Sequence, residues 1–137
     1  MFITIEKVLL LKQFPFLKDV SNMALSDLIA VSEEHNFSIG ENLITENKTN
    51  QELYFIISGT LIRTRQNETN ELTGKNVVGL DSVFLKDPAT ETIRVKQEGF
   101  ALKVGRDKLY RTMSLHPSLA MAILNELSIL IRNKKNN

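Results

Sequence analysis

The sequence predicts a mixed α+β domain, because the spacing of its apolar residues changes twice along the chain. Before residue 36 the apolar residues recur at helical intervals. Between Phe37 and Val104 the period shortens to two, and glycine or asparagine turns separate the runs, as in a series of short strands. After Gly105 the helical spacing returns. Helices on either side of a strand-rich middle indicate a mixed domain with one core.

Length, composition and charge narrow the function classes. The 137 residues suit one domain, divided here into helices (1–35), strands (36–104) and helices (105–137). A formal net charge of +1 predicts no direct DNA contact. The absence of cysteine excludes disulfides and thiolate metal sites and fits a cytoplasmic location. No apolar run approaches a membrane span, and residues 1–11 do not have the features of a signal peptide.

Two helices are expected before the strands. Phe2–Lys12 has an apolar face wider than one stripe, and Phe14–Leu17 should end that helix. Ser21 can cap a second helix from Asn22 to about Glu34, with its leucines and isoleucine facing inward.

The strand region is divided by polar turns. Glu52–Ser58 and Thr60–Ile62 lie on either side of Gly59, and Phe100–Val104 closes the series. Further segments with strand periodicity or turn residues are expected at Phe37–Ile44 with a turn at Gly40, the polar turn Glu46–Asn50, the polar loop Arg65–Asn70 and the turn at Gly74.

Two helices should follow the strands. Asp107 is the expected cap of the first, which runs to about Leu115, and Pro117 starts the second, which runs from Ser118 to about Arg132. The apolar residues of the second helix cover more than one packing stripe, which predicts a dimer or lid helix. They are Leu119, Ile123, Leu124, Leu127, Leu130 and Ile131.

The stretch Gly79–Val95 has the strongest functional signal. A glycine follows an apolar pair, a short helical turn is expected at Asp81–Phe84, and an alternating strand leaves after Pro88. A helix start behind a glycine offers free backbone N–H groups to an anion. A turn that only connects two strands is the other interpretation.

Several motifs resemble the cyclic-nucleotide-binding domain family, the sensor module of catabolite activator protein and of protein kinase A regulatory subunits. They are Leu-Tyr-Phe-Ile with the glycine at 59, the entry turn Phe14–Leu17, the Gly40 turn between the strands of an opening hairpin, and the frame Gly79, Pro88 and Ile93–Val95. The resemblance covers about residues 6–131. It implies a mainly β fold with flanking helices, namely an antiparallel β-roll of the jelly-roll type, and a non-enzymatic regulatory function.

The same resemblance places a ligand pocket at the family's phosphate-binding cassette. In this chain the cassette comprises Gly79, Leu80, Asp81, Ser82, Val83, Pro88, Ala89 and Thr90. Leu80 replaces the glutamate that accepts the ribose hydroxyl, and Ala89 replaces the arginine that pairs with the cyclic phosphate. Since neither side chain can make those bonds, cyclic AMP and cyclic GMP are disfavoured, and no cofactor or metal is expected.

Alternative functions remain open at this point. One is a true cyclic-nucleotide regulator, in a transcription factor or a transport protein, that uses Thr90, Asp81 and backbone amides. Another is an interaction module that forms a homodimer through the last helix. Because no helix-turn-helix follows that helix, a further domain in a larger protein is a related expectation.

Other chemistry has little support in the sequence. His35 and His116 are expected at helix ends facing solvent or a carbonyl, since neither has metal-ligand spacing. Ser58 and Ser82 lack an adjacent base, and Asp81 and Asp87 are expected in turns or caps. The cations Lys12, Lys18, Arg63 and Arg65 are scattered, which is typical of a solvated surface.

Overall fold

The computed structural model describes residues 2–135, and the side chains of residues 134 and 135 are outside the description. The ends of the predicted segments 1–35 and 105–137, at residues 1, 136 and 137, are likewise outside it. Contacts divide the chain into a strand unit, Glu33–Lys103, and a helical unit made of the segments before and after it.

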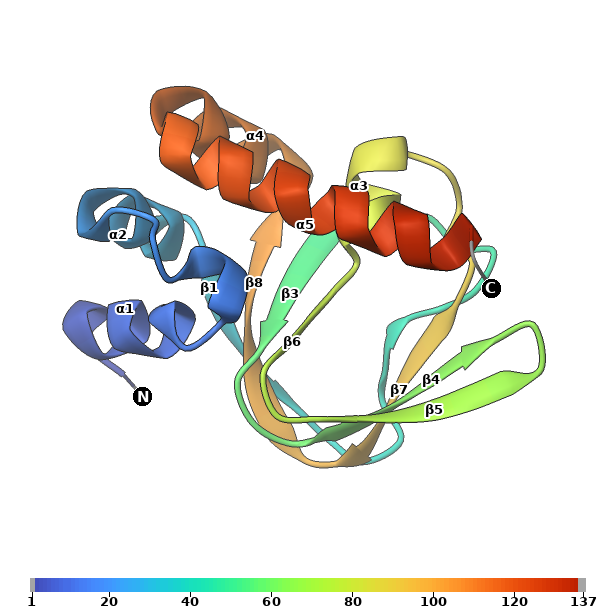
Figure 1. The fold of residues 1–137 in the computed structure, drawn as a ribbon. Helices are drawn as coiled ribbons and strands as arrows, with labels where there is room; N and C mark the ends of the chain where they lie inside the picture. Colours follow the sequence, from blue (N-terminus) through green and yellow to red (C-terminus); the bar gives the residue numbers. More distant parts are fainter. Residues whose placement is uncertain (1, 136–137) are drawn as a thin grey trace. The chain divides into compact units, whose positions relative to one another are not determined.

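Within residues 2–135, the helical unit contains four α-helices and one 3-10 turn (Figure 1). They are α1 (Thr4–Lys12), η1 (Pro15–Leu17), α2 (Asn22–Ala30), α4 (Arg106–Leu115) and α5 (Pro117–Lys135). Ser21 caps α2 as predicted, because its hydroxyl accepts a hydrogen bond from the Ala24 amide at 3.1 Å. The helices bury their apolar faces against one another, with Leu11, Leu25, Leu28 and Leu109 inaccessible to solvent.

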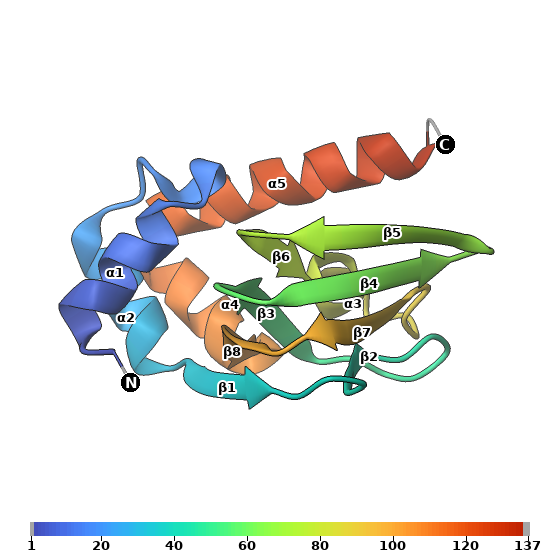
Figure 2. The same ribbon diagram turned by 90° about the horizontal axis from the view of Figure 1, so that it is seen from below.

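The strand unit is an antiparallel β-roll of two four-stranded sheets, which confirms the predicted fold class (Figures 1 and 2). One sheet has the order β1-β8-β3-β6 and the other β2-β7-β4-β5. The strands are β1 (Glu33–Phe37), β2 (Asn42–Ile44), β3 (Glu52–Ile56), β4 (Thr60–Arg65), β5 (Glu68–Thr73), β6 (Asn76–Val78), β7 (Thr92–Gln97) and β8 (Gly99–Gly105).

One short helix, α3 (Leu80–Leu85), belongs to the strand unit and lies between β6 and β7. The inner faces of the two sheets supply the core of the roll, which includes Tyr54, Ile56, Leu61, Val78, Ile93 and Val95. The register pairs Leu61 with Val95 and Arg63 with Ile93. Alternation along each strand therefore places Leu61, Arg63 and Arg65 on the same inward face.

The prediction that the second helix extends to Glu34 is wrong. The helix ends at Ala30, and β1 already begins at Glu33, within the predicted helical segment 1–35. β1 has the sequence Glu-Glu-His-Asn-Phe, which carries no alternating apolar signal. It is a strand because it pairs along its whole length with β8, so long-range pairing overrides local propensity.

Two strand predictions also need correction. Phe37–Ile44 is not a hairpin, since β1 pairs with β8 and β2 pairs with β7 in the other sheet. Gly40, with φ 88°, turns the chain between the sheets. The predicted loop Arg65–Asn70 is mostly strand, because β4 and β5 pair up to Arg65 and Glu68 around a two-residue turn with positive φ at Gln66 and Asn67.

The expected cap of α4 is also wrong by two residues. Gly105 occupies the N-cap, and Asp107 lies in the first turn of the helix. A carboxylate in that turn still interacts favourably with the helix dipole.

Candidate functional site

Gly79 starts the cassette in a backbone conformation that only glycine adopts without strain. Its φ is 91°, and it is the N-cap of α3, whose first turn includes the predicted segment Asp81–Phe84. A Cβ at this position would lie 2.5 Å from the Glu52 carbonyl oxygen and 2.9 Å from Asn50 Nδ2. Close backbone approach and positive φ therefore both require glycine.

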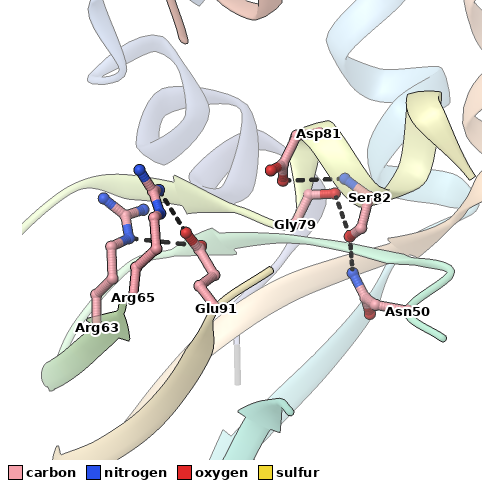
Figure 3. A network of polar contacts seen from close by, with 7 residues as sticks. All are labelled: Asn50, Arg63, Arg65, Gly79, Asp81, Ser82 and Glu91. Carbon is pink, nitrogen blue, oxygen red and sulfur yellow. Dashed lines mark hydrogen bonds and ion pairs between the residues drawn. The ribbon is translucent and has the colours of Figure 1, made fainter. Parts of the chain in front are cut away.

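Asn50 connects the turn before β3 to the start of α3 (Figure 3). Its side-chain amide donates to the Glu52 carbonyl and to Ser82 Oγ, each at 2.9 Å, and its side-chain oxygen accepts from the Glu52 amide at 3.2 Å. The Ser82 hydroxyl donates to the Gly79 carbonyl at 3.3 Å. Asn50 and Ser82 are both buried, so this network stabilises the cassette, and Ser82 is a structural residue rather than a nucleophile.

The two asparagines of the polar turn Glu46–Asn50 have different roles. Asn47 has a positive φ of 67°, which asparagine tolerates better than most residues. Asn50 is not among the residues with positive φ, and it acts instead through its side chain. The turn also pairs with the cassette backbone: the Asn47 amide donates to the Ala89 carbonyl at 2.8 Å, and the Ala89 amide donates to the Lys48 carbonyl at 2.9 Å.

The two positions where the resemblance implies ligand contacts are apolar and buried. Leu80 is 2% exposed and Ala89 is 4% exposed. Val83 is also buried, whereas Pro88 and Thr90 are exposed. Asp81 is half-buried, and its carboxylate accepts from the Ser82 amide at 2.9 Å. One N–H group at the start of α3 is therefore already bonded to an anion of the chain itself.

Arg63 and Arg65 on the inward face of β4 form a charge cluster with Glu91, the residue before β7 (Figure 3). Glu91 Oε1 lies 2.6 Å from Arg65 Nη2, and Glu91 Oε2 lies 3.4 Å from Arg63 Nε. The Glu91 side chain is only 6% exposed. The prediction that these arginines belong to a scattered, solvated surface is wrong, because the strand register turns both of them inward. Arginines two residues apart in a strand were the available signal.

Both histidines have carboxylate partners, which corrects the expectation that they would face only solvent or a carbonyl. His116 does lie at a helix end, as the C-cap of α4, whereas His35 does not. His35 lies in β1, with Nε2 at 2.6 Å from Glu41 Oε2, and His116 Nε2 lies 2.7 Å from Asp27 Oδ2 in the helical unit. Partial burial by itself would raise the pKa of Glu41, but hydrogen bonds from His35 and the Ser38 amide outweigh burial and lower it.

Tyr54 is buried beside this pair, in edge contact with the His35 ring. Burial, with smaller contributions from the charges of Glu52 and Glu41, raises the pKa of Tyr54 to about 12. The phenol therefore stays protonated at physiological pH. Among residues 2–135, no group of three or more histidine, cysteine, aspartate or glutamate side chains is placed to hold a metal ion.

The predicted dimer or lid residues on the last helix fall into two groups. Leu119 and Ile123 are fully buried in the core, so they are unavailable to a partner. Leu124 is 45% exposed and Ile131 is 37% exposed, while Leu127 and Leu130 are half-buried.

The described helices include none that is long and apolar enough to cross a membrane.

A two-sheet β-roll with a short helix between β6 and β7 defines the structural class of this domain. The chain belongs to the family described as the cyclic nucleotide-binding domain, whose sequence model matches residues 34–116, more than half of the chain. This confirms the resemblance. A search of curated proteins finds no match.

Solved structures with the same fold have low sequence identity. The sensor domain of the transcriptional regulator DNR from Pseudomonas aeruginosa aligns with a TM-score of 0.79 at 19% identity, over 100% of this chain and 96% of that chain. The regulatory domain of Toxoplasma gondii PKA with cAMP gives 0.81 at 11% identity, over 95% of this chain and 50% of that chain.

Thermus thermophilus catabolite activator protein gives a TM-score of 0.76 at 14% identity, over 88% of this chain and 60% of that chain. The chain thus spans about half to three fifths of the last two proteins. At these identities the likeness describes the fold alone.

Proposed function

We propose that this domain is a regulatory sensor that does not bind cyclic AMP or cyclic GMP through its cassette. The supporting observation is the burial of Leu80 and Ala89 within an apolar core, at the positions where the family resemblance expects an acceptor and a guanidinium. A ribose hydroxyl and a cyclic phosphate placed there would lose their partners, at a cost of about 1.5–3 kcal/mol for each charge-assisted hydrogen bond.

Isothermal titration calorimetry with cyclic AMP and cyclic GMP tests this proposal. We expect no heat of binding at micromolar concentrations of nucleotide. A variant with Leu80→Glu and Ala89→Arg should acquire measurable binding if it folds, because the frame from Gly79 to Pro88 keeps the family's length. Micromolar binding of either nucleotide by the unmutated chain would contradict the proposal.

A second function is proposed on the exposure of α5. Leu124 and Ile131 present apolar surface to solvent, which is typical of an interaction surface when several such residues lie together. We propose that the domain self-associates through this surface. The partial coverage of two longer regulatory proteins also supports the proposal that the domain functions as part of a larger protein.

A further inference from the structure

The charge cluster of Arg63, Arg65 and Glu91 is unusual because it lies on the core-facing side of a sheet. Its strand neighbours on the same face are Leu61, Ile93 and Val95, which are all buried. The Glu91 side chain is 6% exposed, whereas those of Arg63 and Arg65 are 23% and 26% exposed. Charges that are buried even in part are costly unless each finds a partner, so an ion cluster at this position needs an explanation beyond a solvated surface.

The cluster contains more positive than negative charge. Two guanidinium groups meet the single buried carboxylate of Glu91. The other carboxylate facing them belongs to Glu68, which is opposite Arg65 in the β4–β5 register, but Glu68 is exposed. Asn70, opposite Arg63, is uncharged and also exposed. One guanidinium charge therefore has no buried counter-charge among these facing groups.

Hydrogen bonding within the cluster is also incomplete. The Nε atoms of Arg63 and Arg65 are buried, and neither makes a hydrogen bond to any of the residues that the structure describes. An unbonded, buried N–H group on a charged side chain is costly, by about 1–3 kcal/mol or more. An oxyanion is the partner that this donor geometry matches, since arginine presents its N–H groups in a fixed fork.

Glu91 shows how such an anion would be held. Its two oxygens are divided between the two arginines, one at 2.6 Å from Arg65 and the other at 3.4 Å from Arg63. The pair thus already brackets a group with two acceptor oxygens. Glu91 follows Ala89 by two residues, so the bracketed carboxylate lies at the end of the cassette segment (Figure 3).

We propose that Arg63 and Arg65 form an anion-binding site for the phosphate or carboxylate group of a small ligand, and that Glu91 is the internal carboxylate which this ligand displaces. This proposal rests on the proposed sensor function and adds the chemical group that the sensor binds. The arginines on β4 would take the place of the cassette arginine, whose position is occupied here by Ala89. Displacing Glu91 links occupancy of the site to the start of β7.

The first test uses the unmutated chain. The Nε–H signals of Arg63 and Arg65 are followed by NMR during titration with inorganic phosphate, with acetate, and with sodium chloride at matched ionic strength. A saturable shift with phosphate or acetate, absent with chloride, supports the site and identifies the group it takes. Signals that move equally with all three salts, or not at all, would overturn the proposal.

The second test uses variants. Glu91→Gln keeps the shape of the side chain but removes its charge, and should tighten binding of the effective anion by about tenfold, the equivalent of one charge-assisted hydrogen bond. Arg63→Gln with Arg65→Gln should abolish binding. Arg94→Gln is the matched control, because Arg94 lies on the opposite face of the same sheet and is exposed. Equal weakening by the control would contradict the assignment.

The same variants separate this inference from the proposed function. Cyclic AMP binding that survives Arg63→Gln with Arg65→Gln would contradict the proposed function while the phosphate and acetate titrations still decide the anion site. Cyclic AMP binding that is lost in that variant would also contradict the proposed function, but it would support the arginine site, because the two arginines would then be needed to hold the nucleotide.

Discussion

At the scale of single residues, Asn50 links two segments that are far apart in the sequence. Its amide group bonds the backbone at Glu52 and the hydroxyl of Ser82, and all of these groups are buried or half-buried. A glycine at this position could make none of these side-chain bonds. The start of α3 is therefore held by a polar network that the sequence pattern did not indicate.

Replacing Asn50 tests the contribution of this network. Asn50→Ala leaves the Ser82 hydroxyl and the Glu52 amide without their partner, which should lower the free energy of unfolding by about 1–3 kcal/mol. Urea unfolding followed by circular dichroism measures the change. Asn42→Ala, at an exposed position on β2, is the control and should change stability by less than about 0.5 kcal/mol. Equal stability of the two variants would show that the network contributes nothing.

Glu41 should make the stability of the roll depend on pH. Its folded-state pKa lies below the unfolded value of 4.5, because hydrogen bonds from His35 and Ser38 outweigh partial burial. The ionised carboxylate therefore stabilises the fold above pH 4.5, and this contribution is lost as the pH falls through the lower, folded-state pKa.

Comparing the unmutated chain with Glu41→Gln measures the effect. The difference in unfolding free energy should be constant near neutral pH and should shrink as the pH falls below 4.5. Glu71→Gln is the control, since Glu71 pairs with Lys96 at an exposed site and should contribute little. A difference that grows on acidification would contradict the sign of the pKa shift.

At the scale of elements, the sequence predicted those segments whose signal is local. Ser21 is a cap at the start of a periodic apolar run, and α2 begins where expected. Gly79 and the residues after it predicted α3 within a residue at each end. The strand β3 follows from the run Leu-Tyr-Phe-Ile, which is buried at every position. In each case the residues that decide the structure are adjacent in the chain.

Elements that depend on distant partners were predicted poorly. β1 is a strand only through its pairing with β8, and β4 continues to Arg65 only because β5 pairs with it. The same limit applies to the site. The cassette could be found from Gly79 and Pro88, but the contact of Arg63 and Arg65 with Glu91 requires the register between β4 and β7. A register shift of one residue would turn these arginines outward.

At the scale of the whole molecule, the fold is common to sensors of different kinds, so it cannot specify the ligand. Structures that align over nearly the whole chain share only 11–19% of its residues. Inside the roll, this domain has apolar residues at two cassette positions and an arginine pair on β4. We expect ligand preference to follow those residues.

Self-association is the last prediction, and it concerns the exposed apolar residues of α5. Leu124 and Ile131 each expose more than a third of their surface. Fully burying an exposed side chain of this kind contributes about 1.5–3 kcal/mol, and burying the exposed part of Leu124 or Ile131 contributes a fraction of that, so several residues from each chain are needed to hold a weak dimer after the entropy cost of association. Light scattering over a concentration series should show a mass that rises above that of one chain.

Substitutions on the same helix identify the surface. Leu124→Glu with Ile131→Glu should give a folded monomer, because each charge would be buried without a partner in the dimer. Asn125→Glu, at an exposed position between them, is the control and should still dimerise. Leu119→Glu should instead unfold the chain, since Leu119 is fully buried. A monomer at high concentration in the unmutated chain would contradict self-association and would leave a further domain as the partner to test.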